Sequence, residues 1–248
     1  HHSDQGAGLF LSRIEWQLER FGLPREAIAP AAAALAERLG GEQRVTFADE
    51  KPAVAIFVSR QDHCLLDLLW RKRTGELPME VPLVISNHAT LEPVAESFRI
   101  PFFCLPVTKD TKAAQEAEVL ALLRRHHVDL VVLARYMQVL SADFCSRMPG
   151  RIINIHHSFL PGFKGARPYQ QAYERGVKMI GATAHYVTAD LDEGPIIDQG
   201  VVPVDHSMDA AALSVMGRDV ERQVLARAVT LQAEDRLFLI GHRVVVFH

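Results

Sequence analysis

Polar side chains at the ends of two neighbouring apolar runs include an amide, an imidazole and carboxylates, which could assist a reaction that passes through an oxyanion. Asn154 and His156 lie two residues apart at the end of an apolar run, and the acidic loop after the next such run carries Asp190, Asp192 and Glu193. Residues two apart in an extended strand share a face, whereas His157 points elsewhere. Together an amide, an imidazole and a carboxylate supply an oxyanion donor, a proton carrier and a partner that tunes it. Taken singly, each is more simply explained by a local hydrogen bond.

The elements that must position these side chains alternate between short apolar runs and helical patterns. Five runs, apolar on both faces as in interior parallel strands, are Ala53–Ser59, Pro82–Ser86, Phe102–Leu105, Leu130–Ala134 and Ile152–Ile155. Helical patterns between them are Cys64–Arg73, Thr111–Arg125 and Ser141–Met148. This alternation predicts a doubly wound, mostly parallel α/β sheet, in which ligands bind beyond the carboxyl ends of the strands. Asn154 and His156 stand at such an end.

Two further elements complete the predicted domain, which spans residues 53–248. Asp209–Gln232 is a long helical pattern with Leu213, Val220, Val224 and Ala228 on one stripe, and is predicted to be a packing helix. Arg236–Phe247, with Gly241 at its centre, is predicted to be a terminal β-hairpin.

Residues 1–48 form a shorter region with its own pattern. A strand over Phe10–Trp16, a helix over Arg25–Leu39 and a strand over Arg44–Phe47 are predicted. Three such elements are too few to close a core. We therefore expect that this region pairs with another subunit or that the natural chain begins earlier. Residues 49–52 are charged and end in a proline, and are predicted to be a linker.

The composition favours a small solute as the binding partner. Lys and Arg number 27 against 30 Asp and Glu, giving a net charge of −3 with no basic run, which argues against nucleic acid and anionic membranes. The longest apolar runs, Ala31–Ala36 and Ala53–Val58, fall far short of the roughly 20 residues of a bilayer span. Three scattered cysteines argue against a disulfide framework or a cysteine-built zinc site. A cytoplasmic location is expected.

A metal-dependent hydrolase is an alternative interpretation of the same polar residues. His156, His185 and Asp192 are ligand types that a zinc ion accepts. The sequence holds no His-Glu-x-x-His motif, and His156 and His157 point to opposite faces of an extended segment. We therefore expect no catalytic metal, and a chelator tests this expectation.

The spacing of these motifs resembles the folate-dependent formyltransferase family. Asn154-Ile155-His156 is followed by Ser158-x-Leu160-Pro161 and then by His185 and Asp192-x-Gly194. The resemblance extends over nearly all of residues 53–248 and implies a formyltransferase-like domain. Residues 1–48 resemble the later half of an ACT regulatory module, a ferredoxin-like α+β unit.

The resemblance implies a role for each matching residue. Asn154, His156 and Asp192 match the catalytic trio: Asn154 donates to the oxyanion, His156 carries a proton, and Asp192 positions and deprotonates water. The segment that follows the predicted strand Leu130–Ala134 matches the pterin-binding loop. Met137 and Leu140 would there pack against the flat faces of the pterin ring. The expected substrate-binding residues are Arg135, Met137, Gln138, Val139, Leu140, His185, Val187 and Gly194. Without the resemblance, the same loop is an ordinary strand-to-helix connection.

The resemblance also implies partners for the chain. The folate is the substrate, so no further organic cofactor is expected. ACT-like modules associate edge to edge and bind small effectors, which implies a homo-oligomer and an effector of unknown identity.

Within the family, the formyl group is passed either to water or to an amine. The transferases carry a glycine-rich turn after the first strand that cradles a phosphate. Here the turn between Ser59 and Cys64 has no glycine, and Asp62 would repel a phosphate, although Arg60 could hold an anion. The sequence therefore favours hydrolysis of 10-formyltetrahydrofolate to formate and tetrahydrofolate, which supplies formate for purine and one-carbon metabolism. Formyl transfer to an amine is the alternative, and a folate-binding sensor without catalysis is a second one.

Overall fold

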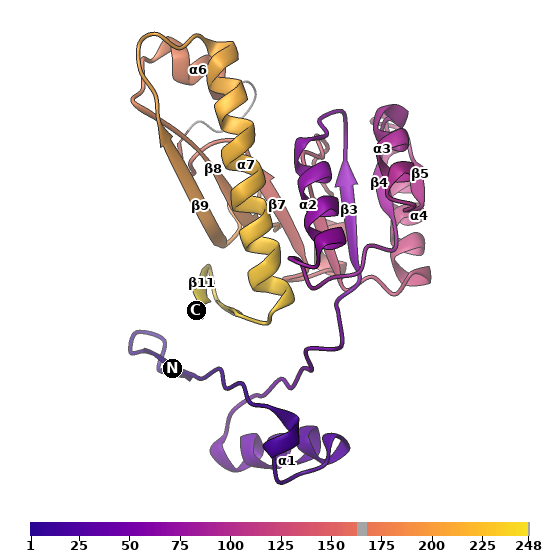
Figure 1. Cartoon of the computed structure of the whole chain (residues 1–248), viewed down its shortest axis with the longest axis vertical. Helices are drawn as coiled ribbons and strands as arrows, with labels where there is room; N and C mark the ends of the chain where they lie inside the picture. The colour runs from indigo at the N-terminus through magenta and orange to yellow at the C-terminus, as the bar shows by residue number, and fades with distance from the viewer. Residues whose placement is uncertain (163–167, 248) are drawn as a thin grey trace. The chain divides into compact units, whose positions relative to one another are not determined.

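The computed structural model describes residues 1–162 and 168–247, which divide into two compact units (Figure 1). One unit comprises residues 1–50 together with Phe247. The other comprises residues 51–246 and contains all of the predicted site residues.

The first unit contains a hairpin and a helix. Strands β1 (His2–Asp4) and β2 (Leu9–Leu11) pair antiparallel. A 3₁₀ turn, η1 (Leu18–Arg20), precedes helix α1 (Arg25–Leu39), which has the predicted bounds. The helix ends at Gly40, whose φ of 65° lies in the left-handed region that glycine adopts without steric cost.

Both strands that the sequence predicted in this unit are corrected by the structure. The Phe10–Trp16 strand reaches only to Leu11, and Arg44–Phe47 contains no strand. An extended segment becomes a strand only when a neighbour supplies hydrogen bonds, which a local pattern does not encode. Instead, the Arg25 guanidinium stacks 3.9 Å from the centroid of the Phe47 ring, which holds this segment against the start of α1. The ACT-like interpretation of residues 1–48 stays a prediction.

The second unit is built on a seven-stranded sheet in the order β5-β4-β3-β6-β7-β8-β9. Its strands are β3 (Val54–Val58), β4 (Val84–Ser86), β5 (Phe102–Cys104), β6 (Leu130–Leu133), β7 (Ile152–His156), β8 (Met179–Tyr186) and β9 (Ile196–Pro203). The first five of these are mutually parallel, and β8 and β9 continue the sheet antiparallel. The mostly parallel α/β sheet and its five predicted parallel strands are confirmed.

Helices cover both faces of this sheet. They are α2 (His63–Thr74), η2 (Ala89–Leu91), α3 (Glu92–Ser97), α4 (Lys112–Arg125), α5 (Ala142–Arg147), α6 (Pro168–Glu174) and α7 (Ala210–Ala233). Apolar residues of α2, α3 and α7 form one core with alternate strand residues, and those of α4 and α5 form a second core with the others. The two cores lie on opposite faces because successive strand residues point to opposite sides.

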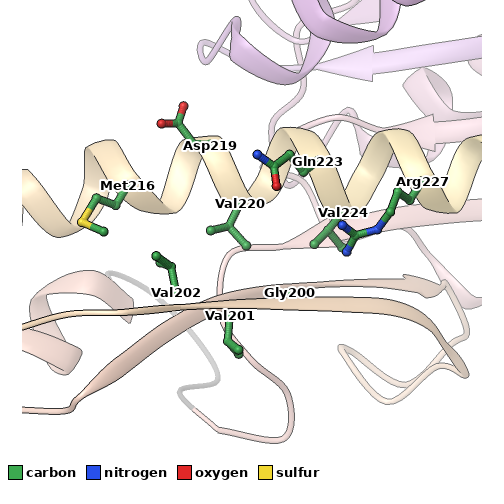
Figure 2. A pocket seen from close by; sticks show the side chains of 9 residues that line it. All are labelled: Gly200, Val201, Val202, Met216, Asp219, Val220, Gln223, Val224 and Arg227. Carbon is green, nitrogen blue, oxygen red and sulfur yellow. The ribbon is translucent and has the colours of Figure 1, made fainter. Parts of the chain in front are cut away.

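Helix α7 packs closely against the antiparallel edge of the sheet. A Cβ on Gly200 of β9 would lie 2.7 Å from Cγ2 of Val224, so only glycine permits this approach. Beside this contact is a groove of about 290 Å³ (Figure 2). Its lining comprises Gly200, Val201, Val202, Met216, Asp219, Val220, Gln223, Val224 and Arg227, none of which is a predicted site residue.

The chain closes with the predicted hairpin, formed by β10 (Leu237–Ile240) and β11 (Arg243–Val246). Within residues 1–162 and 168–247, no helix is both long enough and apolar enough to cross a membrane.

Candidate active site

The end of β7 carries two of the three candidate catalytic side chains. Ile153 and Ile155 belong to the core on the α2 and α7 face, so Asn154 and His156 point to the opposite face. The register of the antiparallel partner β8 places His185 directly opposite Asn154. His185 is therefore held beside the trio by the sheet itself.

His185 fixes the orientation of the Asn154 amide. Nδ1 of His185 lies 2.8 Å from the backbone carbonyl of Tyr186, which can only accept, so Nδ1 carries the proton. Nε2 is then a bare acceptor for the Asn154 Nδ2–H group at 3.2 Å. Burial lowers the pKa of His185 and favours this neutral form. The second hydrogen of the Asn154 amide can donate to a bound molecule.

The loop after β8 brings Asp192 to the two histidines. Asp192 Oδ1 lies 3.3 Å from Nδ1 of His156 and 3.8 Å from Nε2 of His185. The hydrogen bond from His156 holds the pKa of Asp192 below its ordinary value, although burial opposes this shift. Asp192 is therefore ionised at neutral pH. Its φ of 56° is unusual for a residue with a side chain and marks a constrained loop.

The other ring nitrogen of His156 is free to meet a ligand. Nε2 is buried and has no hydrogen-bond partner among the residues that the structure describes. A buried polar atom without a partner costs about 1–3 kcal/mol and is rare in native proteins. A bound molecule that hydrogen bonds to Nε2 would remove this cost.

Gly194 sets the path of the loop that carries Asp192. A Cβ at this position would lie 1.7 Å from the backbone oxygen of Tyr186 and 3.3 Å from Nδ1 of His185. The loop can therefore pass this close to β8 only with glycine. The structure therefore shows a packing function for Gly194, and the substrate contact implied by the resemblance stays a prediction.

The segment predicted to bind the pterin follows β6. Met137 and Val139 are exposed, Gln138 is half-buried, and Leu140 is buried in the core on the α4 and α5 face. The backbone N–H of Met137 donates to Oγ of Ser59 at 2.9 Å, which anchors the loop to the residue that follows β3. Exposed apolar side chains on an anchored backbone suit the face of a flat ring.

Two other predicted binding residues are turned toward the protein interior. Arg135 is 9% exposed, and its Nε lies 3.5 Å from Glu221 of α7. Val187 packs against the α4 and α5 core, and its backbone N–H donates to the carbonyl of Ile152 at 2.9 Å, which extends the pairing of β7 with β8. These contacts direct the two side chains to Glu221 and to the core rather than to the trio.

A second polar group, which sequence reasoning missed, lies beside the trio. We call Glu221, His63, Arg135 and Tyr169 the Glu221 cluster. Glu221 Oε2 accepts a hydrogen bond from His63 Nε2 at 2.8 Å, and Oε1 accepts one from the Tyr169 hydroxyl at 2.6 Å. Glu221 is one of several charged residues in an ordinary helical pattern, which gave no signal that this residue is buried.

His157 lies between the trio and the Glu221 cluster. The centroid of its ring is 5.3 Å from that of His156 and 6.2 Å from that of Tyr169. Burial, aided by the positive charge of Arg135, lowers the pKa of His157 to about 3, so its ring is neutral at physiological pH.

One set of side chains has the composition of a metal site. The ligand atoms of His63, Cys64 and Glu221 lie within 4.8 Å of one another. However, His63 already bonds directly to Glu221, and the guanidinium of Arg135 neutralises the same carboxylate. These contacts favour a hydrogen-bonded cluster over a cation site.

A cavity of about 460 Å³ lies beside His157, which forms part of its wall. It is mostly apolar, and its lining includes Phe159, Tyr169, Ala172 and Ile180. Tyr169 therefore lines this cavity with its ring and also donates a hydrogen bond to Glu221 with its hydroxyl.

Comparison with known proteins identifies relatives along nearly the whole chain. The family model described as "Formyl transferase" matches residues 53–229. The chain is 55% identical over 246 residues to a formyltetrahydrofolate deformylase of Synechocystis, covering 99% of this chain and 86% of that protein.

Solved structures agree with this relationship. A formyltetrahydrofolate deformylase from Pseudomonas syringae pv. tomato superposes with a TM-score of 0.96 at 43% identity, covering 100% of this chain and 83% of that one. A glycinamide ribonucleotide transformylase from Symbiobacterium toebii superposes with a TM-score of 0.76 at 32% identity, covering 84% of this chain and 99% of that one.

Proposed function

Because the chain belongs to the formyltransferase family, we propose that it is an enzyme that hydrolyses 10-formyltetrahydrofolate to formate and tetrahydrofolate. The observation that carries this proposal is the ionised Asp192 at 3.3 Å from His156, beside an oriented Asn154, in a chain 55% identical to a deformylase. The formate would supply purine and one-carbon metabolism.

In this proposal Asp192 prepares the attacking water. Its carboxylate is ionised and partly exposed, so it can accept a proton from a water molecule at the mouth of the site. The water oxygen forms a bond to the formyl carbon, and the carbonyl oxygen becomes an oxyanion. Asp192 holds the proton for the next step.

Asn154 stabilises the oxyanion. Its amide donates one hydrogen to His185, which leaves the other for the substrate. A preorganised donor of this kind contributes about 3 kcal/mol to stabilisation of the transition state. His185 acts here as a positioning residue.

His156 completes the reaction at the leaving nitrogen. Its Nδ1 faces Asp192, and its free Nε2 faces away from that carboxylate, so the ring can pass a proton from one side to the other. The bond between carbon and N10 breaks as N10 takes the proton, which leaves tetrahydrofolate and formic acid. The acid ionises to formate in water.

The loop from Arg135 to Leu140 would bind the pterin. Exposed Met137 and Val139 supply apolar surface, and the anchored backbone supplies donors and acceptors for the edge of the ring. Folate is the substrate in this scheme, and none of the steps requires a further cofactor. We also propose a cytoplasmic location and a homo-oligomer, as the composition and the ACT-like region suggest.

The comparisons favour hydrolysis over transfer to an amine. The deformylase structure is more similar to this chain than the transformylase structure is, both in TM-score and in identity. The sensor alternative does not require the ionised carboxylate and free imidazole nitrogen that the site contains.

The decisive experiment measures formate released from 10-formyltetrahydrofolate without any added amine. We expect Asp192→Asn to lower kcat by about 10²–10⁴-fold, because it removes the base. Asp190→Asn, which makes the same charge change at an exposed position two residues away, should retain activity within about twofold. Activity of the unmodified protein should also survive a chelator. A folded protein that releases no formate would refute the proposal.

A further inference from the structure

The Glu221 cluster is a largely buried group of polar side chains that none of the proposed reaction steps uses. Glu221 is fully buried, and His63 and Arg135 are each 9% exposed. Burial opposes the ionisation of Glu221, but the hydrogen bond from His63, the charge of Arg135 and the Tyr169 hydroxyl together hold its pKa below the ordinary value. An ionised carboxylate is thus buried and compensated by residues from three other segments of the chain.

The acidic and histidine members of the cluster lie on the opposite face of the sheet from the side chains of Asn154 and His156, and Arg135 reaches them from the start of the loop that follows β6. Asn154 and His156 point to the face covered by α4 and α5, whereas Glu221 belongs to α7 and His63 begins α2 on the other face. His157, which follows His156 along the chain, contacts the cluster through Tyr169. Folate bound beside Asn154 and His156, on the α4 and α5 face of the sheet, would leave the α2 and α7 face for any other substrate.

We propose that the Glu221 cluster determines acceptor specificity by filling the space that an amine acceptor would need, so that only water reaches the formyl carbon. This inference rests on the proposed hydrolysis. An amine must bring its nitrogen to the position of the attacking water and must also accommodate its substituent. The buried side chains of His63 and Arg135 and the partly buried side chain of Tyr169 occupy the α2 and α7 side, where that substituent would extend.

Tyr169 is the most informative position in the cluster. Its ring packs against Gly217 of α7 so closely that a Cβ there would lie 2.1 Å from the ring, and its hydroxyl reaches Glu221. It also lines the cavity of about 460 Å³ beside His157. Removing the ring would extend this cavity to the carboxylate of Glu221 and open a path for an amine.

The test measures how the formyl group is partitioned between water and glycinamide, a small primary amine. Formate and N-formylglycinamide are quantified together with total consumption of 10-formyltetrahydrofolate. We expect formate almost exclusively from the unmodified protein, and at least a roughly tenfold larger formylglycinamide fraction from Tyr169→Ala or His63→Ala. Tyr169→Phe keeps the ring and should change the fraction by less than about twofold. Val215→Ala, at an exposed position of α7, is the matched control.

The outcomes separate this inference from the proposed function. Folded, active Tyr169→Ala and His63→Ala variants with an unchanged fraction would overturn the acceptor role, as would an unmodified protein that readily formylates glycinamide. If both variants fold but lose all turnover, the cluster is needed for the reaction itself, and the inference also fails. Failure of the unmodified protein to release formate without glycinamide would refute the proposed function instead.

Discussion

Asn154 is oriented by a histidine that does not need to contact the substrate. His185 donates to a backbone carbonyl and accepts from Asn154, so the direction of one amide depends on the protonation state of a buried imidazole. Protonation of Nε2 would replace an acceptor with a donor and turn the amide away. Burial, which lowers the pKa of His185, therefore protects the oxyanion donor from mild acid.

This arrangement predicts a specific loss when the amide is removed. Asn154→Ala should lower kcat by about 10²–10³-fold while KM changes little, because the lost hydrogen bond forms mainly in the transition state. Steady-state formate release measures both constants, and thermal unfolding checks the fold. A rise in KM with unchanged kcat would instead assign Asn154 to substrate binding.

The loop after β8 positions Asp192, and Gly194 determines its course. Gly194→Ala would place a Cβ 1.7 Å from the Tyr186 carbonyl oxygen, so the loop must move away from the strand. We expect kcat to fall about 10²-fold, since a shift of about 1 Å in a catalytic group has effects of this size. Gly22→Ala, at a position where a Cβ would have no neighbour within 4 Å, should leave kcat unchanged. Equal activity of the two variants would contradict this function of Gly194.

The same elements show which features a sequence pattern can predict. Strands β3, β4, β5, β6 and β7 carry continuous apolar runs typical of interior parallel strands, which identified them without knowledge of their neighbours. The Arg44–Phe47 segment has a strand-like composition, yet it stacks on Arg25 because strand formation depends on a partner elsewhere. Similarity to the family, rather than spacing alone, joined Asn154 and His156 to Asp192.

The Glu221 cluster was not predicted because its contacts join distant parts of the molecule. His63 and Glu221 are separated by 158 positions in the sequence, and Tyr169 comes from a third segment. On the α7 pattern, Glu221 is indistinguishable from the exposed charged residues of the same helix. Only the packing of α7 against both α2 and the sheet shows that Glu221 is buried.

At the scale of the whole molecule, the buried histidines should make stability depend on pH. His157 has a folded pKa of about 3, below the 6.5 of an unperturbed histidine, so between these values the unfolded state binds more protons. Stability should therefore rise with pH across this window and fall as pH decreases from about 6.5 toward 3. Below about pH 4.5, Asp192 and Glu221 also lower the free energy of unfolding as pH falls. Their ionised forms stabilise the folded state and are lost as pH falls through their lowered pKa values.

Urea unfolding of the unmodified protein and of His157→Asn, at about pH 7 and pH 5, tests this expectation. A single histidine that stays neutral when folded reduces the free energy of unfolding by at most about 1.4 kcal/mol for each pH unit below its unfolded pKa. His157→Asn removes that contribution, so its free energy of unfolding should decrease less between the two pH values. The remaining decrease reflects groups such as His185, whose pKa is also lowered by burial. An identical pH dependence in both proteins would show that His157 is already protonated in the folded state, and the neutral ring inferred beside the trio would then be wrong.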